Sequence, residues 1–208
     1  MAVIKLRKKK KFSISTSSTE IQHLIISWLS IALIFTILNG VSRYGYLISF
    51  FIAAFTVGLG FLCHEAAHKF VAQKYGCFAE FRADFPMLII AVVMAVFFGF
   101  TFVAPGAVWI HGNVTRQSNG KISAAGPITN FVLAIIFFLL ALLFSNPFMI
   151  YFCATGMLIN TVLGLFNMIP FWIFDGSKIW RWSIPVYLVM AAFGVGLIFL
   201  RKLLFQMM

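Results

Sequence analysis

Six long runs of apolar residues, separated by short polar segments, dominate the pattern along the chain. They cover Ile21–Leu38, Tyr46–Phe70, Met87–Val103, Pro127–Phe144, Phe148–Ile169 and Ile184–Leu204. A helix needs about 20 mostly apolar residues to cross a bilayer, and most of these runs approach that length. The longest polar stretch between them, His111–Ser123, is too short to form a soluble domain. The pattern predicts an all-α polytopic membrane protein with five or six transmembrane helices.

Residues 77–85 break the helical pattern, because their side chains alternate along the segment. One side would carry Cys77, Ala79, Phe81, Ala83 and Phe85, and the other Phe78, Glu80, Arg82 and Asp84. A period of two is typical of a β-strand with one apolar face. A second strand-like stretch, Val108–Val114, could pair with it. Since unpaired backbone groups are costly in lipid, we expect a small membrane-associated β-hairpin that packs on protein or lies at the interface.

Composition agrees with a membrane protein. Of the 208 residues, 62% are hydrophobic and only 10% are charged, with a mean hydropathy of +1.01. Soluble domains carry about 25% charged residues. These values exclude a soluble enzyme, a disulfide scaffold and a disordered protein.

The net charge of +11 is unevenly distributed. Six basic residues lie between positions 5 and 11, and the others flank the apolar runs. This distribution is typical of the positive-inside rule and of contact with anionic lipid. We therefore expect the lipid bilayer and no nucleic acid as a partner, a multi-pass protein of the cell membrane, and residues 1–20 as a basic cytoplasmic tail.

The clearest chemical motif is the sequence His-Glu-Ala-Ala-His at positions 64–68, near the end of the second apolar run. On a helix, His64 and His68 share one face and can bind one Zn²⁺ per chain. Glu65 would then be the general base that acts on a water molecule. Ionisable residues among spanning segments are costly in lipid and usually functional.

A catalytic zinc ion usually has three protein ligands and one open position, so a third ligand is needed. The chain has only five acidic residues. Asp175 stands out because it directly follows the apolar run 171–174. We therefore favour Asp175 as the third ligand, with His111 in the polar segment as a distant second.

Three motifs together resemble the signatures of site-2 proteases, which are intramembrane zinc metalloproteases. They are HEAAH at 64–68, AAGPITN at 124–130 and NMIPFWIFDG at 167–176. The resemblance implies that Asp175 is a zinc ligand and that Asn130 lies near the catalytic centre, where it positions substrate or stabilises the intermediate. It implies a transmembrane protein as substrate, and a single transmembrane protease domain at 21–208 with its catalytic core at about 46–180. The chain departs from many members by having Trp172 and Ile173 in place of prolines. This departure leaves Asp175 intact, but the backbone path just before it need not follow that of the family.

The proposed ligands also bear on topology. With Met1 in the cytosol, the second helix returns toward the cytoplasm and places His64 and His68 near that side. Asp175 reaches the same side only if Met87–Val103 enters the bilayer and turns back. The re-entrant topology leaves just Arg43, Arg201 and Lys202 outside, whereas a sixth span leaves five basic residues outside. We favour the re-entrant topology, with a plain span as the alternative.

Two further expectations concern function. A substrate helix must unwind before cleavage, and the edge of strand Cys77–Phe85 could pair with the extended chain. The alternatives to a protease are a zinc-binding membrane transporter or sensor and an inactive membrane scaffold. A transporter would need a second ion site, for which the chain has few acidic residues, and a scaffold would not need Glu65.

Overall fold

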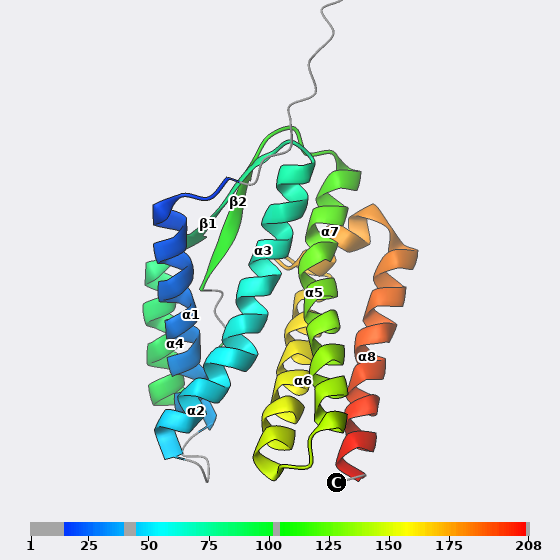
Figure 1. Ribbon diagram of the computed structural model, residues 1–208. Helices are drawn as coiled ribbons and strands as arrows, with labels where there is room; N and C mark the ends of the chain where they lie inside the picture. The colour runs from blue at the N-terminus through cyan, green and yellow to red at the C-terminus, as the bar shows by residue number, and fades with distance from the viewer. Residues whose placement is uncertain (1–14, 40–44, 102–104, 207–208) are drawn as a thin grey trace, which may run out of the picture.

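A computed structural model describes residues 15–39, 45–101 and 105–206 (Figure 1). The elements in chain order are α1 (Ser18–Asn39), α2 (Gly45–Ala53), the π-helix η1 (Ala54–Gly58), α3 (Leu59–Lys74), β1 (Phe78–Ala83), α4 (Phe85–Phe98), β2 (Gly106–His111), α5 (Arg116–Leu143), α6 (Pro147–Asn167), α7 (Asp175–Trp182) and α8 (Ile184–Gln206). In this part of the chain, five helices are long and apolar enough to cross a membrane: Ser18–Leu38, Gly45–Lys74, Arg116–Leu143, Pro147–Asn167 and Ile184–Lys202. The predicted fold class is confirmed.

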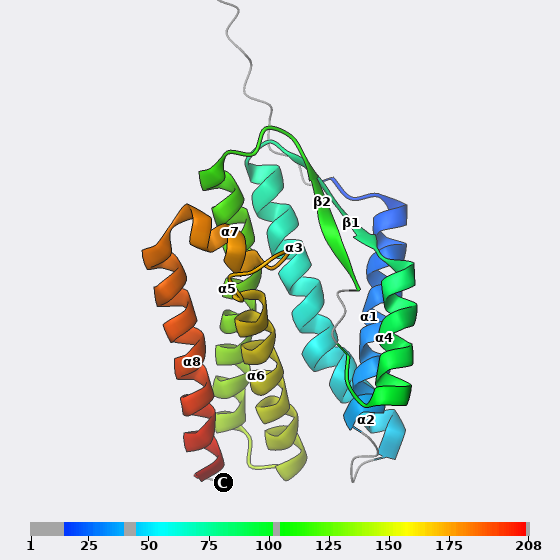
Figure 2. The same cartoon turned by 180° about the vertical axis from the view of Figure 1, so that it is seen from behind.

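The long helix that carries the His-Glu-Ala-Ala-His motif lies in the middle of the molecule. In Figures 1 and 2, α1, α4 and the two-stranded sheet flank α3 on one side, and α5, α6 and α8 flank it on the other. The short helix α7 lies at the same end of the molecule as the sheet (Figure 1). One buried cluster joins α5, α6 and α8, and a second joins α1, η1, α3 and β1.

The described residues at the two ends of the segment between the strands lie side by side. The strands are antiparallel, with Ala83 opposite Gly106, and the Asp84 N–H donates to the Pro105 carbonyl at 3.1 Å. The residues before α4 and after its return are therefore neighbours. A helix that crossed a bilayer would leave its ends roughly 30 Å apart. Of the two topologies, the structure agrees with the re-entrant one, and α4 has only 14 residues.

Other boundaries differ from those expected. Helix α5 begins at Arg116 rather than at Pro127, because Thr115 caps it and buried residues such as Ile122 pack its polar first turns against protein. The polar segment after Asp175 also forms a helix, α7. Sequence hydropathy locates the apolar part of a helix and misses a polar extension that packs on a neighbour.

The start of α1 is bound to the α3 and β1 end of the fold. Helix α1 begins at Ser18, and the fully buried Glu20 carboxylate accepts a hydrogen bond from Lys69 Nζ at 2.5 Å and from the Phe81 N–H at 3.0 Å. Lys69 also donates to Thr16 Oγ1 at 2.9 Å. Glu20 is distant from the motif in sequence, yet its ion pair holds the residue next to His68.

Candidate metal centre

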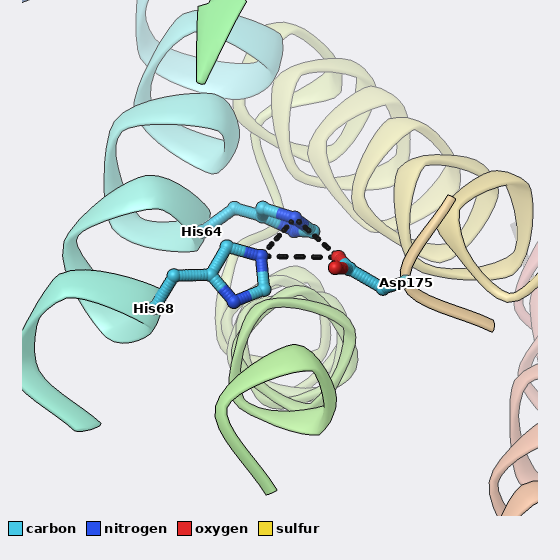
Figure 3. A group of neighbouring side chains, drawn as sticks. All are labelled: His64, His68 and Asp175. Carbon is cyan, nitrogen blue, oxygen red and sulfur yellow. Dashed lines mark hydrogen bonds and ion pairs between the residues drawn. The ribbon is translucent and has the colours of Figure 1, made fainter. Parts of the chain in front are cut away.

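The two histidines of the motif project from the same face of α3 toward the first residue of α7. Figure 3 shows His64, His68 and Asp175 pointing to one another. The two Nε2 atoms are 2.9 Å apart, and Asp175 Oδ2 lies 3.3 Å from His64 Nε2 and 3.0 Å from His68 Nε2. All three residues are buried, with exposed fractions of 5%, 8% and 7%. The structure thus brings together three residues that are up to 111 positions apart in the sequence.

The partner of each Nδ1 atom decides which imidazole nitrogen faces this centre. His68 Nδ1 lies 2.8 Å from the Ile122 carbonyl on α5. His64 Nδ1 lies 2.6 Å from Oδ1 of Asn130, which is also on α5. Both partners are oxygen acceptors, so each Nδ1 carries the hydrogen and each Nε2 presents a lone pair. Metal-binding histidines are commonly oriented in this way.

Three acceptor atoms therefore converge with no hydrogen between them. Two imidazole lone pairs and a carboxylate oxygen repel one another unless a cation or an added proton lies between them. Donors arranged tetrahedrally around zinc at about 2.0–2.1 Å are roughly 3.3 Å apart. The observed separations of 2.9–3.3 Å come close to this spacing. The donor set fits a zinc ion, and it is the one such group in the described ranges.

Two glycines let the surrounding helices approach this centre. A Cβ atom at Gly126 would lie 2.5 Å from Nε2 of both His64 and His68. A Cβ atom at Gly176 would lie 2.1 Å from the Met168 carbonyl oxygen. Only a residue without a side chain fits at either position. The glycine at position 126 of the AAGPITN motif is therefore required by the close approach of α5 to the histidines.

Glu65 lies next to the centre and touches the sheet. Its Oε2 accepts a hydrogen bond from the Val108 N–H of β2 at 3.2 Å. Among the described residues, Oε1 has no hydrogen-bond partner. One oxygen is thus oriented by the strand while the other is left without a partner in the described part of the chain.

Asn130 is fully buried behind His64. Its Nδ2 group donates to the Gly60 carbonyl at 3.1 Å and to Asn160 Oδ1 at 3.2 Å, while its Oδ1 faces His64. Both amide hydrogens therefore already have partners. In this arrangement Asn130 contacts His64 directly.

The other acidic and histidine candidates have structural partners elsewhere. His111 ends β2, is exposed and contacts the rings of Phe78 and Trp109. Glu80 pairs with Arg82 at 2.8 Å, and Asp84 caps α4 by accepting from the Met87 N–H. None of these three belongs to the group of converging donors in the described part of the chain.

The segment before Asp175 takes an unusual backbone path at the position where this chain lacks a proline. Trp172 has a φ angle of 49°, in the left-handed region that side chains rarely adopt. Ser177 Oγ donates to the Trp172 carbonyl at 3.0 Å and thereby holds this turn. The turn lets the chain enter α7 with Asp175 as its first residue.

Sequence reasoning missed Gly60 and Asn160, which contact Asn130. A signal was present, since Asn160 is a polar residue in the middle of an apolar span, and such residues are usually functional. The carbonyl of Ile122 and the N–H of Val108 carry no sequence signal, because every residue has these groups.

Comparisons with known proteins agree with a metal centre. The chain is 41% identical over 193 residues to a protein of Methanocaldococcus jannaschii named "Putative zinc metalloprotease MJ0611", covering 92% of this chain and 96% of the relative. It is 27% identical over 121 residues to "Zinc metalloprotease MJ0392" of the same organism, covering 57% of this chain and 30% of that protein. No family model matches the chain, and no solved structure matches it significantly.

Proposed function

Because the chain belongs to the zinc metalloprotease family of its archaeal relative, we propose that it is an intramembrane protease of the site-2 type. In this proposal it hydrolyses peptide bonds within or near the transmembrane segments of membrane-protein substrates. The observation that carries the proposal is the position of the metal centre. Two of its three donors lie on Gly45–Lys74, a helix long and apolar enough to cross a membrane. A peptide bond that reaches these donors approaches between apolar helices, which suits a substrate that is itself a membrane segment.

The protein residues divide the chemistry between them. His64, His68 and Asp175 would hold the metal, and a bound zinc ion would supply a Lewis acid and lower the pKa of a water molecule to about 7. We assign proton transfer to Glu65. It accepts a proton as the water attacks the scissile carbonyl and then donates that proton to the leaving amine. The Val108 N–H keeps the Glu65 carboxylate oriented during both transfers.

Asn130 supports this chemistry best as the partner of His64. Its Oδ1 holds the Nδ1 hydrogen, so that the His64 Nε2 lone pair points to the metal centre. A role in stabilising an oxyanion would require one of its amide hydrogens to leave Gly60 or Asn160.

From the sequence we expected substrate to pair at the strand Cys77–Phe85, but the contacts of that strand do not support this edge. The outer edge of β1 is occupied: the Phe81 and Ala83 N–H groups donate to Glu20 and to His23, and the Ala79 carbonyl accepts from Gln73. Side chains of α1 and α3 thus already bond the backbone groups at the edge that the sequence led us to favour.

We propose the outer edge of β2 instead. The Asp84 N–H bonds to the Pro105 carbonyl, so residues 105, 107, 109 and 111 direct their backbone groups toward β1. The N–H groups of Val108 and Ile110, which alternate with them, therefore point away from β1. Val108 points to Glu65, so this edge runs beside the proposed base. Because the Val108 N–H is already bonded to Glu65, an extended substrate would pair through the Ile110 N–H and pass next to the residue that transfers protons.

We further propose that the metal centre lies toward the cytoplasmic side of the cell membrane, with the N-terminus in the cytosol. Basic residues gather on the elements at the end of the molecule where Asp175 lies, namely the end of α3, β1, the start of α5 and α7 (Figure 1). They are Lys69, Lys74, Arg82, Arg116, Lys121, Lys178 and Arg181. Arg201 and Lys202 lie near the other end of α8. This asymmetry supports the assignment through the positive-inside rule.

Cleavage of a model transmembrane peptide by the purified protein tests the proposal. We expect Glu65→Gln to lower the cleavage rate by about 10²–10⁴-fold, because the general base is lost. The zinc content of the variant, measured by atomic absorption, should stay equal to that of the wild type. Asp84→Asn is the matched control, since it also converts an acid to an amide and keeps a residue that caps helices well.

Two results would contradict the proposal. Equal cleavage by Glu65→Gln and the wild type would remove the assigned base. Zinc uptake by liposomes that contain the protein, unaffected by Glu65→Gln and without peptide cleavage, would favour a transporter.

A further inference from the structure

A second asparagine is buried one step behind Asn130. Asn160 lies in the middle of α6 and has an exposed fraction of 0%. Its Oδ1 accepts from Asn130 Nδ2 at 3.2 Å. Its own Nδ2 group lies 2.9 Å from the Gly156 carbonyl and 3.4 Å from the Thr56 carbonyl. An amide in an apolar span is costly unless its groups are paired, and here they are.

These contacts determine the orientation of the Asn160 amide. The Gly156 and Thr56 carbonyls only accept hydrogen bonds, so Nδ2 of Asn160 must face them and Oδ1 must face away. Oδ1 then meets Nδ2 of Asn130. The opposite orientation would place an oxygen against two carbonyl oxygens.

The orientation of the Asn130 amide in turn determines the tautomer of His64. With Nδ2 of Asn130 held by Asn160 and by the Gly60 carbonyl, its Oδ1 is directed at His64 Nδ1. His64 must then carry its hydrogen on Nδ1 and present the Nε2 lone pair. The Gly156 and Thr56 carbonyls thus determine, through Asn160 and Asn130, which nitrogen of His64 carries the hydrogen.

The surrounding backbone leaves room for this arrangement. A Cβ atom at Gly60 would lie 2.4 Å from Asn160 Oδ1. Thr56 belongs to the π-helix η1, a distortion that frequently occurs at functional sites. Helices α6 and α3 therefore approach closely at the point where Asn160 meets Asn130.

We propose that Asn160 is a positioning residue for the zinc ligand His64 and that it acts through Asn130. The inference rests on the proposed zinc site but not on proteolysis. Asn160 does not contact the metal donors; it keeps the Asn130 amide in the orientation that fixes the His64 tautomer. Removing it lets Asn130 turn over and present Nδ2 to His64 Nδ1, which favours the hydrogen on Nε2, where zinc must bind.

The test measures metal affinity, which does not depend on a substrate. Purified full-length variants are titrated with Zn²⁺ against a chromophoric chelator, and with Co²⁺ to record the visible absorption of the bound ion. Loss of an outer partner of a metal-bound histidine costs about 10–100-fold in affinity. For Asn160→Ala we expect a loss near the lower value, about tenfold, with a changed Co²⁺ spectrum.

The neighbouring Thr161 provides a matched control. It is also buried on α6, but its Oγ1 donates to the Met157 carbonyl and does not reach Asn130. Thr161→Ala should leave the zinc affinity and the Co²⁺ spectrum unchanged. Equal effects of Thr161→Ala and Asn160→Ala would overturn the proposal, because they would show a general effect of packing in α6.

A double variant separates action through Asn130 from an independent effect. Asn130→Ala should weaken zinc binding, and adding Asn160→Ala to it should produce no further loss. Additive losses would overturn the proposal.

If Asn160→Ala does not fold, Asn160→Ser carries the same test. A serine can donate to the carbonyl four residues earlier, as Thr161 does, and is too short to reach Asn130. Wild-type affinity in the serine variant would overturn the proposal.

The proposed proteolysis and the proposed role of Asn160 can be disproved independently. Zinc binding that depends on Asn160 without peptide cleavage would overturn the proposed function alone. A wild-type protein that binds neither Zn²⁺ nor Co²⁺ would overturn both.

Discussion

At the scale of single residues, the metal centre depends on which way each hydrogen-bonding group points. The motif at 64–68 supplies two imidazoles on one helix face, but each imidazole has two nitrogens. Partners on α5, the Ile122 carbonyl and Asn130, decide that both Nε2 atoms face Asp175. The chemistry of the donors is therefore completed by a helix that contributes no ligand.

At Gly126, helix α5 leaves no room for a side chain beside the two histidines. Gly126→Ala would place a methyl group 2.5 Å from both Nε2 atoms, so the imidazoles must move apart or α5 must shift. We expect zinc binding and cleavage to fall by about 100-fold, the upper value for a change next to a metal-bound histidine, measured by metal content and peptide hydrolysis. This loss would occur although alanine is the better helix former by about 1 kcal/mol.

Gly196→Ala is the matched control for this substitution. A Cβ atom at Gly196 on α8 meets nothing within 4 Å. This variant should keep wild-type zinc content. Full zinc binding by Gly126→Ala would mean that α5 does not pack on the histidines as described.

At the scale of elements, the sheet has two unlike edges. The edge of β1 is held by side chains from α1 and α3, whereas the edge of β2 meets Glu65. The Glu20–Lys69 pair further joins α1 to the helix that carries the motif. The sheet is thus attached to α1 and α3 at one edge and contacts Glu65 at the other, which is why we propose the edge of β2 for an added strand.

A prediction follows for Ile110, whose N–H points to the outer edge of β2. Ile110→Pro removes this donor and should lower cleavage of a transmembrane substrate by about 2–10-fold, the value of one hydrogen bond of about 0.5–1.5 kcal/mol. Zinc content should not change. Ile110→Ala keeps the N–H group and should retain more activity. Equal losses in the two variants, measured as kcat/KM, would argue against strand pairing at this edge.

At the scale of the whole molecule, the closeness of Asp84 and Pro105 sets the direction of every later helix. Because Ala83 and Gly106 are paired, α5 starts at the end of the molecule where α3 finishes (Figures 1 and 2). Helices α5 and α6 then run in opposite directions, and Asp175 returns to the depth of the histidines. A sixth span would have placed Asp175 on the far side.

Orientation in the membrane can be checked by labelling single cysteines in intact cells. In a variant whose three native cysteines are replaced by alanine, Ser145→Cys lies between α5 and α6 and Asn119→Cys lies in the first turns of α5. We expect an impermeant maleimide to label position 145 directly and position 119 only after permeabilisation. The reverse pattern would place the metal centre toward the outside.

Much of the local structure could be predicted from the sequence because it depends on short-range periodicity. Long apolar runs predicted the spanning helices, alternation at 77–85 predicted β1, and a spacing of four predicted that His64 and His68 share a face. Boundaries were missed where polar residues pack on a neighbour, as in the first turns of α5. Hydropathy measures transfer to lipid and carries no information about such packing.

The sequence alone determined which residue types were available: two histidines on one helix face, one adjacent glutamate and very few other acids. The tertiary structure was needed to show that Asp84 and Pro105 are neighbours, that Asp175 meets the histidines, that side chains of α1 and α3 fill the outer edge of β1, and that Asn160 and Asn130 stand behind His64. The physical reason is that these features depend on directional contacts between segments far apart in the chain. Many of those contacts use backbone N–H and carbonyl groups, which every residue shares and which no sequence pattern can mark.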